Sequence, residues 1–189
     1  MNNTDYLLPG IAAIAVAVLH PIYWISEVSF TAAAGAIRTD IGLLDGLYVV
    51  LAGLTIFIYY SLREILNDHC EYHGFDTLIS IILYTSTALF ILLLVVSLFF
   101  SDTSELPMTV AFPTTLLIFG ATDLLLGIQL LRDSDHLPGL VKAFAVVILV
   151  GGICNLSIIF SGLGLVLFPV AALILALMFL RKPETVEFV

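Results

Sequence analysis

One carboxylate lies deep inside a long apolar run of this sequence, and it is the residue best suited to chemistry. Asp123 sits within LLIFGATDLLLGIQLLR, residues 116–132. A charge near the middle of a bilayer costs about 2.5–3.5 kcal/mol on insertion scales, so we expect this side chain to face other helices or water. It can exchange a proton or contact a passing ion there. The alternative is a carboxyl that stays protonated and hydrogen-bonds to a neighbouring hydroxyl.

Other polar side chains recur at two depths of the predicted spans, as estimated from a rise of 1.5 Å per helical residue. Together with Asp123 they predict a polar path that runs inward from an outer layer to a layer of hydroxyls. The alternative is that each makes a local bond between helices, and such bonds contribute about 0.6 kcal/mol on average in membranes. The outer layer comprises Asp45, His20 and Asn155, and the layer level with Asp123 comprises Thr55, Thr85, Ser86 and Thr87.

Three histidines invite a metal interpretation. His69 and His73 are four residues apart, so they would share one face of a helix, which suits two ligands of one ion. His136 becomes a third ligand if the two spans that precede these histidines are neighbours. Two histidines alone are a weak motif, and the competing interpretation is an interfacial helix with histidines at headgroup level. We therefore expect no metal ion and no other cofactor.

Sequence motifs of enzymes are missing. The chain contains no Gly-x-Ser-x-Gly, no phosphate-binding loop, no His-Glu-x-x-His and no Cys-x-x-Cys. An aspartate dyad needs two carboxylates that share a proton, and only Asp123 is deep. Cys70 and Cys154 fall at different depths, so we expect no disulfide between them. The sequence therefore favours a protein that is not an enzyme.

The composition of the chain is that of a membrane protein. The chain of 189 residues is 61% hydrophobic and 11% charged, with a mean hydropathy of +1.16. Soluble chains are about 45–50% apolar and about 25% charged, so we expect a single polytopic membrane domain over residues 1–189. A net charge of −9 with six Lys and Arg argues against nucleic acid as a partner. The expected partners are the lipid bilayer and either a second copy of the chain or another membrane protein.

The apolar runs are long enough to cross about 30 Å of hydrocarbon, and they predict an all-α integral membrane protein with a bundle of six transmembrane helices. The spacing Gly42-x-x-x-Gly46 is of the kind that lets helices approach closely. Small Gly120 and Ala121 would allow close approach near Asp123. The predicted spans are residues 7–25, 42–62, 77–100, 110–131, 140–160 and 162–180.

Two segments between these spans carry helical patterns of their own. Residues 26–41 read as a linker, with a short interfacial helix that presents Phe30, Ala33, Ala34 and Ile37 on one face. The second span is expected to continue unbroken beyond Leu62 to about His73, because its apolar spacing does not stop at the membrane surface.

The distribution of basic residues predicts the orientation. Five fall in one set of loops and ends and one in the other, so the positive-inside rule places both termini in the cytoplasm, in the cell membrane. A chain of five spans, with the region after residue 140 re-entrant, would put the basic tail outside, which this rule disfavours. The five are Arg63, Arg132, Lys142, Arg181 and Lys182, and the single opposing residue is Arg38.

Two functional hypotheses follow. In the first, the protein moves an ion or small solute along a polar path that includes Asp123. In the second, it is a non-catalytic accessory or scaffold subunit of a membrane complex, and Asp123 makes a structural hydrogen bond. We favour transport, because an ionisable residue inside a membrane is by default a candidate functional site.

Overall fold

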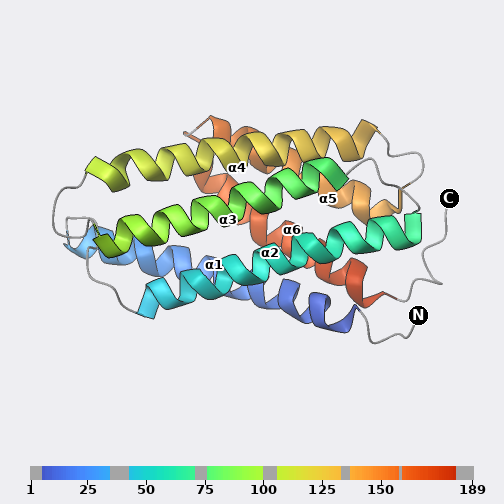
Figure 1. Cartoon of the computed structure of the whole chain (residues 1–189), viewed down its shortest axis with the longest axis horizontal. Helices are drawn as coiled ribbons and strands as arrows, with labels where there is room; N and C mark the ends of the chain where they lie inside the picture. The colour runs from blue at the N-terminus through green and yellow to red at the C-terminus, as the bar shows by residue number, and fades with distance from the viewer. Residues whose placement is uncertain are drawn as a thin grey trace.

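Six α-helices and no strand make up the described part of the chain in the computed structural model (Figure 1). The structure describes residues 6–34, 43–70, 76–99, 106–132, 137–157 and 159–181. The predicted all-α bundle is confirmed. The helices are α1 (Leu7–Ala34), α2 (Leu43–Cys70), α3 (Asp76–Phe99), α4 (Leu106–Arg132), α5 (Gly139–Leu156) and α6 (Ser161–Leu180).

Most of these helices have the length and composition of membrane spans, since a helix needs about 20 apolar residues to cross a bilayer. Within the described residues, five helices are long and apolar enough, and α3 counts as a shorter apolar helix over Asp76–Leu92. The fold is therefore that of a helical membrane bundle. The five stretches are Leu7–Ser29, Leu43–Asp68, Pro113–Arg132, Gly139–Leu156 and Ser161–Leu180.

Several helices end at other residues than the apolar runs predict. The linker expected after residue 25 is wrong for residues 26–34, which continue α1 to Ala34; residues 35–41 lie outside the description. The helix continues past Pro21 because membrane helices tolerate an internal proline. Glu27 and the alanines at 32–34 are good helix formers. Helix α4 begins at Leu106 rather than 110.

Helix α5 stops at Leu156, four residues before the predicted end at 160. Ser157 accounts for this early end. Its hydroxyl donates to the carbonyl of Cys154 at 2.7 Å and accepts from the amide N–H of Phe160 at 3.2 Å. A serine that bonds to nearby backbone groups competes with the helical hydrogen bonds and favours a turn.

Helix α2 continues without a break through Arg63 and Asn67 to Cys70, as the sequence predicts; residues 71–73 lie outside the description. Its last turns are tied to the start of α3. Asp76 accepts hydrogen bonds on Oδ1 from Arg63 Nε at 2.6 Å and from Asn67 Nδ2 at 2.7 Å. These bonds hold the α2–α3 hairpin together at one end.

The helices form a closed ring in chain order. Each packs against its neighbours in sequence, and α6 packs against α1 to close the ring. Figure 1 views the ring from the side, with α3 nearest the viewer. The contacts of α3 with α2 and α4 are the sparsest in the ring, and those between α4 and α5 are the densest. A ring of this kind encloses an interior in which side chains from non-adjacent helices meet.

Glycines explain the close approach of α4 and α5. A Cβ added at Gly152 would lie 2.7 Å from the carbonyl oxygen of Gly120, and one added at Gly127 would lie 2.9 Å from the carbonyl oxygen of Ala145. The close contact expected at Gly120 is therefore confirmed. Gly46 has nothing within 4 Å of such a Cβ, so the prediction of close packing there is wrong for the described residues; Gly42 lies outside them.

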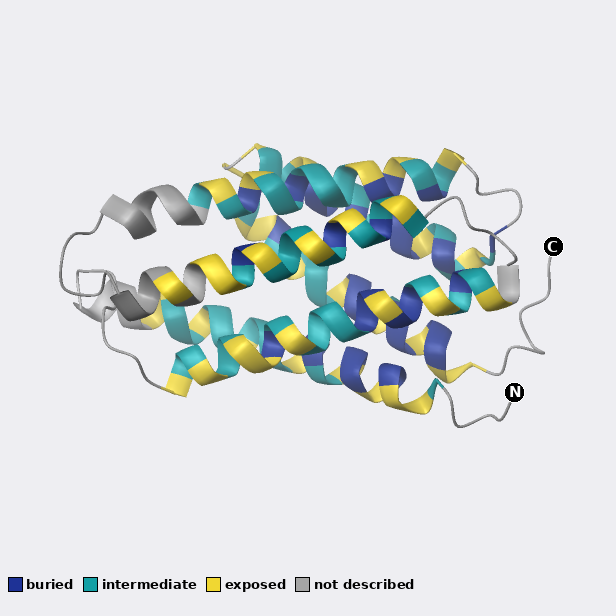
Figure 2. Cartoon of the chain, in the orientation of Figure 1, coloured by how far each residue is buried: buried dark blue, intermediate teal, exposed yellow. Residues whose placement is uncertain are grey.

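The buried core is concentrated in one half of the bundle, which we call the termini half (Figure 2). In this half α1, α3 and α5 begin, and α2, α4 and α6 end. The opposite half of the described chain contains fewer buried side chains. The interior is thus sealed by apolar packing toward one face of the bundle. Fully buried side chains of the termini half include Val16, Leu62, Leu66, Ile79, Leu126, Leu130, Val141 and Phe144.

Candidate functional site

Asp123 lies at the boundary between the two halves. It shares one face of α4 with Leu126 and Leu130, three and seven residues further on, and both of these are fully buried. This spacing turns the carboxylate toward the interior of the ring. There the hydroxyl of Tyr59 on α2 donates a hydrogen bond to the Asp123 carboxylate. Helix α3 separates α2 from α4 in the ring, so this bond crosses the interior.

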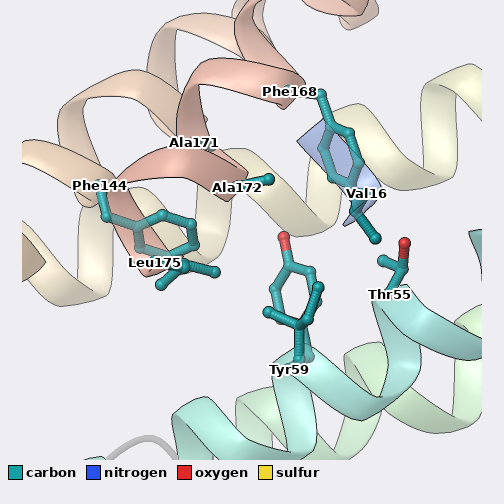
Figure 3. Close-up of a pocket in the computed structure, with 9 residues that line it drawn as sticks. Val16, Thr55, Tyr59, Phe144, Phe168, Ala171, Ala172 and Leu175 are labelled. Carbon is teal, nitrogen blue, oxygen red and sulfur yellow. The ribbon is translucent and has the colours of Figure 1, made fainter. Parts of the chain in front are cut away.

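Tyr59 also borders a small cavity between α1, α2 and α6 (Figure 3). The hydroxyls of Tyr59 and Thr55 both point from α2 into this space. The cavity has a volume of about 10 Å³. A single water needs roughly 10–15 Å³ and two to four polar partners, so this cavity is at the lower limit of that size and offers at most the two hydroxyls. The remaining lining is apolar and comprises Val16, Ile58, Phe144, Phe168, Ala171, Ala172 and Leu175.

His20 lies one helical turn beyond Val16 toward the opposite half. Its Nε2 accepts a hydrogen bond from Trp24 Nε1 at 3.1 Å, so the neutral ring carries its proton on Nδ1. That Nδ1 is buried and has no hydrogen-bond partner among the described residues. The His20 ring also contacts Phe168, with ring centroids 4.7 Å apart. Because Phe168 lines the cavity, its ring stands between His20 and the two hydroxyls.

Further aromatic rings continue from His20 across the opposite half. Tyr23 packs against Trp24 at a centroid distance of 5.4 Å and against Tyr48 of α2 at 5.8 Å, and Tyr48 packs against Phe90 of α3 at 5.7 Å. These rings link α1, α2 and α3, where the aliphatic core is sparse. Their amphipathic character suits a position near the membrane surface.

Asn155 lies where α5 meets α4 and α6, against Gly120 and one helical turn from Asp123 along α4. A Cβ added at Gly164 of α6 would overlap its Oδ1, and one added at Gly120 of α4 would lie 3.1 Å from its Cβ. The carboxamide is therefore wedged between α4 and α6. Its Oδ1 is buried without a hydrogen-bond partner among the described residues.

The other predicted path residues lie apart from the pair. Thr87 of α3 donates its hydroxyl to the carbonyl of Leu83 in its own helix at 2.8 Å. Thr85 and Ser86 are half-buried on the same helix. Asp45 lies in the first turn of α2, ten residues and about 15 Å of helix before Thr55. The structure therefore groups Asp123 with α2 rather than with α3.

The proposed metal ligands fall largely outside the description. His69 is in the last turn of α2, but its side chain is not described, and neither His73 nor His136 is among the described residues. Within the described residues no group of three or more His, Cys, Asp or Glu side chains is placed to hold a metal ion. Cys154 is a free thiol on α5.

Tyr59 is the member of the site that depth matching misses. It follows Thr55 by four residues, so it shares the helix face of Thr55 and lies one turn closer to the termini half. The available signal is that a buried tyrosine usually finds a partner for its hydroxyl. The Tyr59 phenol thus connects the Asp123 carboxyl to a small cavity that the Thr55 hydroxyl also borders, and such groups can exchange protons and form hydrogen bonds.

Comparison with known proteins adds no family to this description: no family model, curated protein or solved structure matches the chain.

Proposed function

We propose that this protein moves an ion or small solute across the membrane along a path through the interior of the helix ring, with Asp123 on that path. One observation carries the proposal. The carboxylate lies inside the bundle, bonded to the hydroxyl of buried Tyr59 beside a cavity, where the dense apolar core of the termini half begins.

The energetics of the pair support a functional role over a structural one. A hydrogen bond between membrane helices contributes about 0.6 kcal/mol on average and about 1.7 kcal/mol at most. Placing an aspartate at the centre of a membrane helix costs about 2.5–3.5 kcal/mol. The hydrogen bond from Tyr59 therefore does not offset the free-energy cost of placing the carboxylate in the membrane. Two apolar side chains at these positions would stabilise the bundle better. A residue that costs stability is explained more simply by what it binds.

The size of the cavity favours a second candidate, the accessory or scaffold subunit. A volume of about 10 Å³ admits no solute larger than water. In that case the chain binds another membrane protein, and α3, which has the sparsest contacts in the ring, offers the natural contact face. Asp123 then only orients α2 against α4.

Ion flux into liposomes containing the purified protein separates the candidates. We expect Asp123→Asn to abolish flux, because the amide keeps the size and hydrogen-bonding capacity of the side chain but neither ionises nor carries a proton. Asp68→Asn is the matched control: Asp68 is exposed and accepts a 3.3 Å bond from the Tyr6 hydroxyl at the end of the bundle. Flux from wild type that survives in Asp123→Asn contradicts the path.

We also propose that all six helices cross the membrane and that both termini are cytoplasmic, from the asymmetry of the basic residues. Cysteines introduced at Ser104 and Glu184, in a background without native cysteines, should react with an impermeant thiol reagent from opposite sides. Labelling of both positions from the same side contradicts this orientation.

A further inference from the structure

We infer that the ion is the proton, and that it reaches Asp123 from the opposite half of the bundle through Tyr59, Thr55 and His20. This inference rests on the proposed function, and it names the ion and the side from which it enters. Its basis is the geometry of the pair and its cavity rather than the presence of a carboxylate alone.

The ligands around Asp123 suit a proton and not a dehydrated metal cation. Hard cations such as Ca²⁺ take six to eight oxygen ligands, and Mg²⁺ takes six. Among the described residues the titratable partner of Asp123 is Tyr59. The adjacent Thr122 hydroxyl is directed to the carbonyls of Ile118 and Phe119 in its own helix, at 3.0 Å each. One carboxylate and one phenol supply fewer oxygen ligands than such a cation takes, but they can pass a proton.

The polar groups follow one another along the interior in the order that a relay requires. Asp123 accepts from Tyr59, and the Tyr59 hydroxyl opens onto the cavity that Thr55 also faces. Beyond Phe168 lies His20, whose buried Nδ1 has no partner among the described residues. Buried polar atoms nearly always find a partner, so this N–H is a donor that still needs an acceptor. Movement of the Phe168 ring would open it to the cavity that Tyr59 and Thr55 line.

The transfer balances as a chain of proton exchanges. Tyr59 gives its hydroxyl proton to the Asp123 carboxylate and takes one from the cavity water. His20 reprotonates that water from Nδ1, directly or through the Thr55 hydroxyl, and takes a replacement proton on Nε2 from the solution at the opposite half, which breaks the hydrogen bond from Trp24. The carboxylate gains one proton and the solution at the opposite half loses one. Toward the termini half, buried side chains such as Leu126 and Leu130 block the same route in this conformation.

Proton movement can be measured in liposomes that contain a trapped pH indicator and a potassium diffusion potential, with radioactive Na⁺ and Rb⁺ uptake measured in parallel. We expect Tyr59→Phe to lower proton flux by about 100-fold or more, the scale of a lost proton-transfer group. Tyr60→Phe is the matched control, because Tyr60 is adjacent in sequence but exposed. Thr55→Val should lower flux, and Thr122→Val should not.

The outcomes distinguish this inference from the proposed function. Proton flux that is lost in Asp123→Asn and Tyr59→Phe and kept in Tyr60→Phe supports both. Flux of Na⁺ or Rb⁺ that requires Asp123, without proton flux, keeps the proposed function and overturns the inference. Proton flux unchanged in Tyr59→Phe also overturns it. Absence of any ion flux from folded wild type removes both proposals.

Discussion

The α4–α5 contact allows a sharp test of the structure through Gly152. A Cβ at this position would lie 2.7 Å from both the carbonyl oxygen of Gly120 and the backbone nitrogen of Leu124. Ordinary Cβ contacts begin at 3.4 Å, so Gly152→Ala is short of room by 3.4 − 2.7 = 0.7 Å. Both obstructing atoms belong to the backbone of α4 and cannot rotate away. The two helices must therefore separate.

The expected cost follows from the size of this displacement. Overpacking a close-packed interface costs typically about 1–3 kcal/mol. Alanine regains up to about 1 kcal/mol over glycine in helix propensity. We expect Gly152→Ala to lower the free energy of unfolding by about 1–2 kcal/mol after this gain. Because Gly120 is one turn from Asp123, the same displacement should shift the carboxylate relative to Tyr59 and lower ion flux.

Unfolding by sodium dodecyl sulfate in mixed micelles measures this difference, and the chain supplies its own graded controls. Gly53→Ala should be neutral or slightly stabilising, because nothing lies within 4 Å of its Cβ position. Gly10→Ala should fall between the two, since its obstruction is the flexible side chain of Leu180. If Gly152→Ala is as stable as Gly53→Ala, the α4–α5 packing described above is wrong.

Three other predictions concern the pair, the hairpin and the single tryptophan. Tyr59→Phe should lower the free energy of unfolding by about 1–3 kcal/mol, because it leaves the Asp123 carboxyl without its hydrogen-bond donor. The double variant Tyr59→Phe, Asp123→Leu should be at least as stable as wild type and carry no flux. A double variant that is less stable than wild type would show that the pair is structural. A double-mutant cycle of Arg63→Gln and Asp76→Asn should give a coupling free energy of about 0.2–1 kcal/mol. This coupling should weaken at high salt, because both side chains are partly exposed. A coupling that does not change with salt contradicts a screened ion pair. Acidification should change the fluorescence emission of Trp24, because a proton on His20 Nε2 removes the acceptor of the Trp24 indole N–H. The variant His20→Gln should suppress this change in emission. If the emission of that variant titrates as in wild type, His20 is not the cause.

The sequence predicts the number of helices and the last span almost to the residue, because uninterrupted apolar runs have one stable arrangement in a bilayer. The span predicted over 162–180 is found as Ser161–Leu180. Helix ends are predicted less well where helical residues continue beyond the apolar run. Residues 30–34 lie beyond the apolar stretch Leu7–Ser29 but contain no Gly or Pro, so α1 extends through them to Ala34.

Lateral contacts are harder to predict than spans, because apolar residues face lipid and protein alike. The sequence indicates small residues at both Gly46 and Gly120, but only Gly120 contacts another helix among the described residues. The position of Asp123 along its helix predicts its depth in the membrane. It does not predict which side chain bonds to the carboxyl, because the rotation of each helix about its axis decides which side chains meet. Thr55 and Tyr59 share a face, and the rotation of α2 presents the phenol to Asp123.

The positions of Asp123 and Tyr59 within their helices bear on their function. On α4 the inward stripe runs through Leu116 and Gly120 to Asp123 and then through buried Leu126 and Leu130; on α2 it runs from Leu51 through Thr55 and Tyr59 to Leu62 and Leu66. Asp123 on α4 and the pair Thr55 and Tyr59 on α2 thus replace apolar side chains at the same depth of the bundle. This depth adjoins the dense core of the termini half, on the side of the opposite half. A layer this thin is too shallow for a hydrated ion and deep enough for one carboxyl, one phenol and one water. Its placement against the dense core fits the proposal that Asp123 is loaded from one side, which a bond serving only to join α2 to α4 would not require.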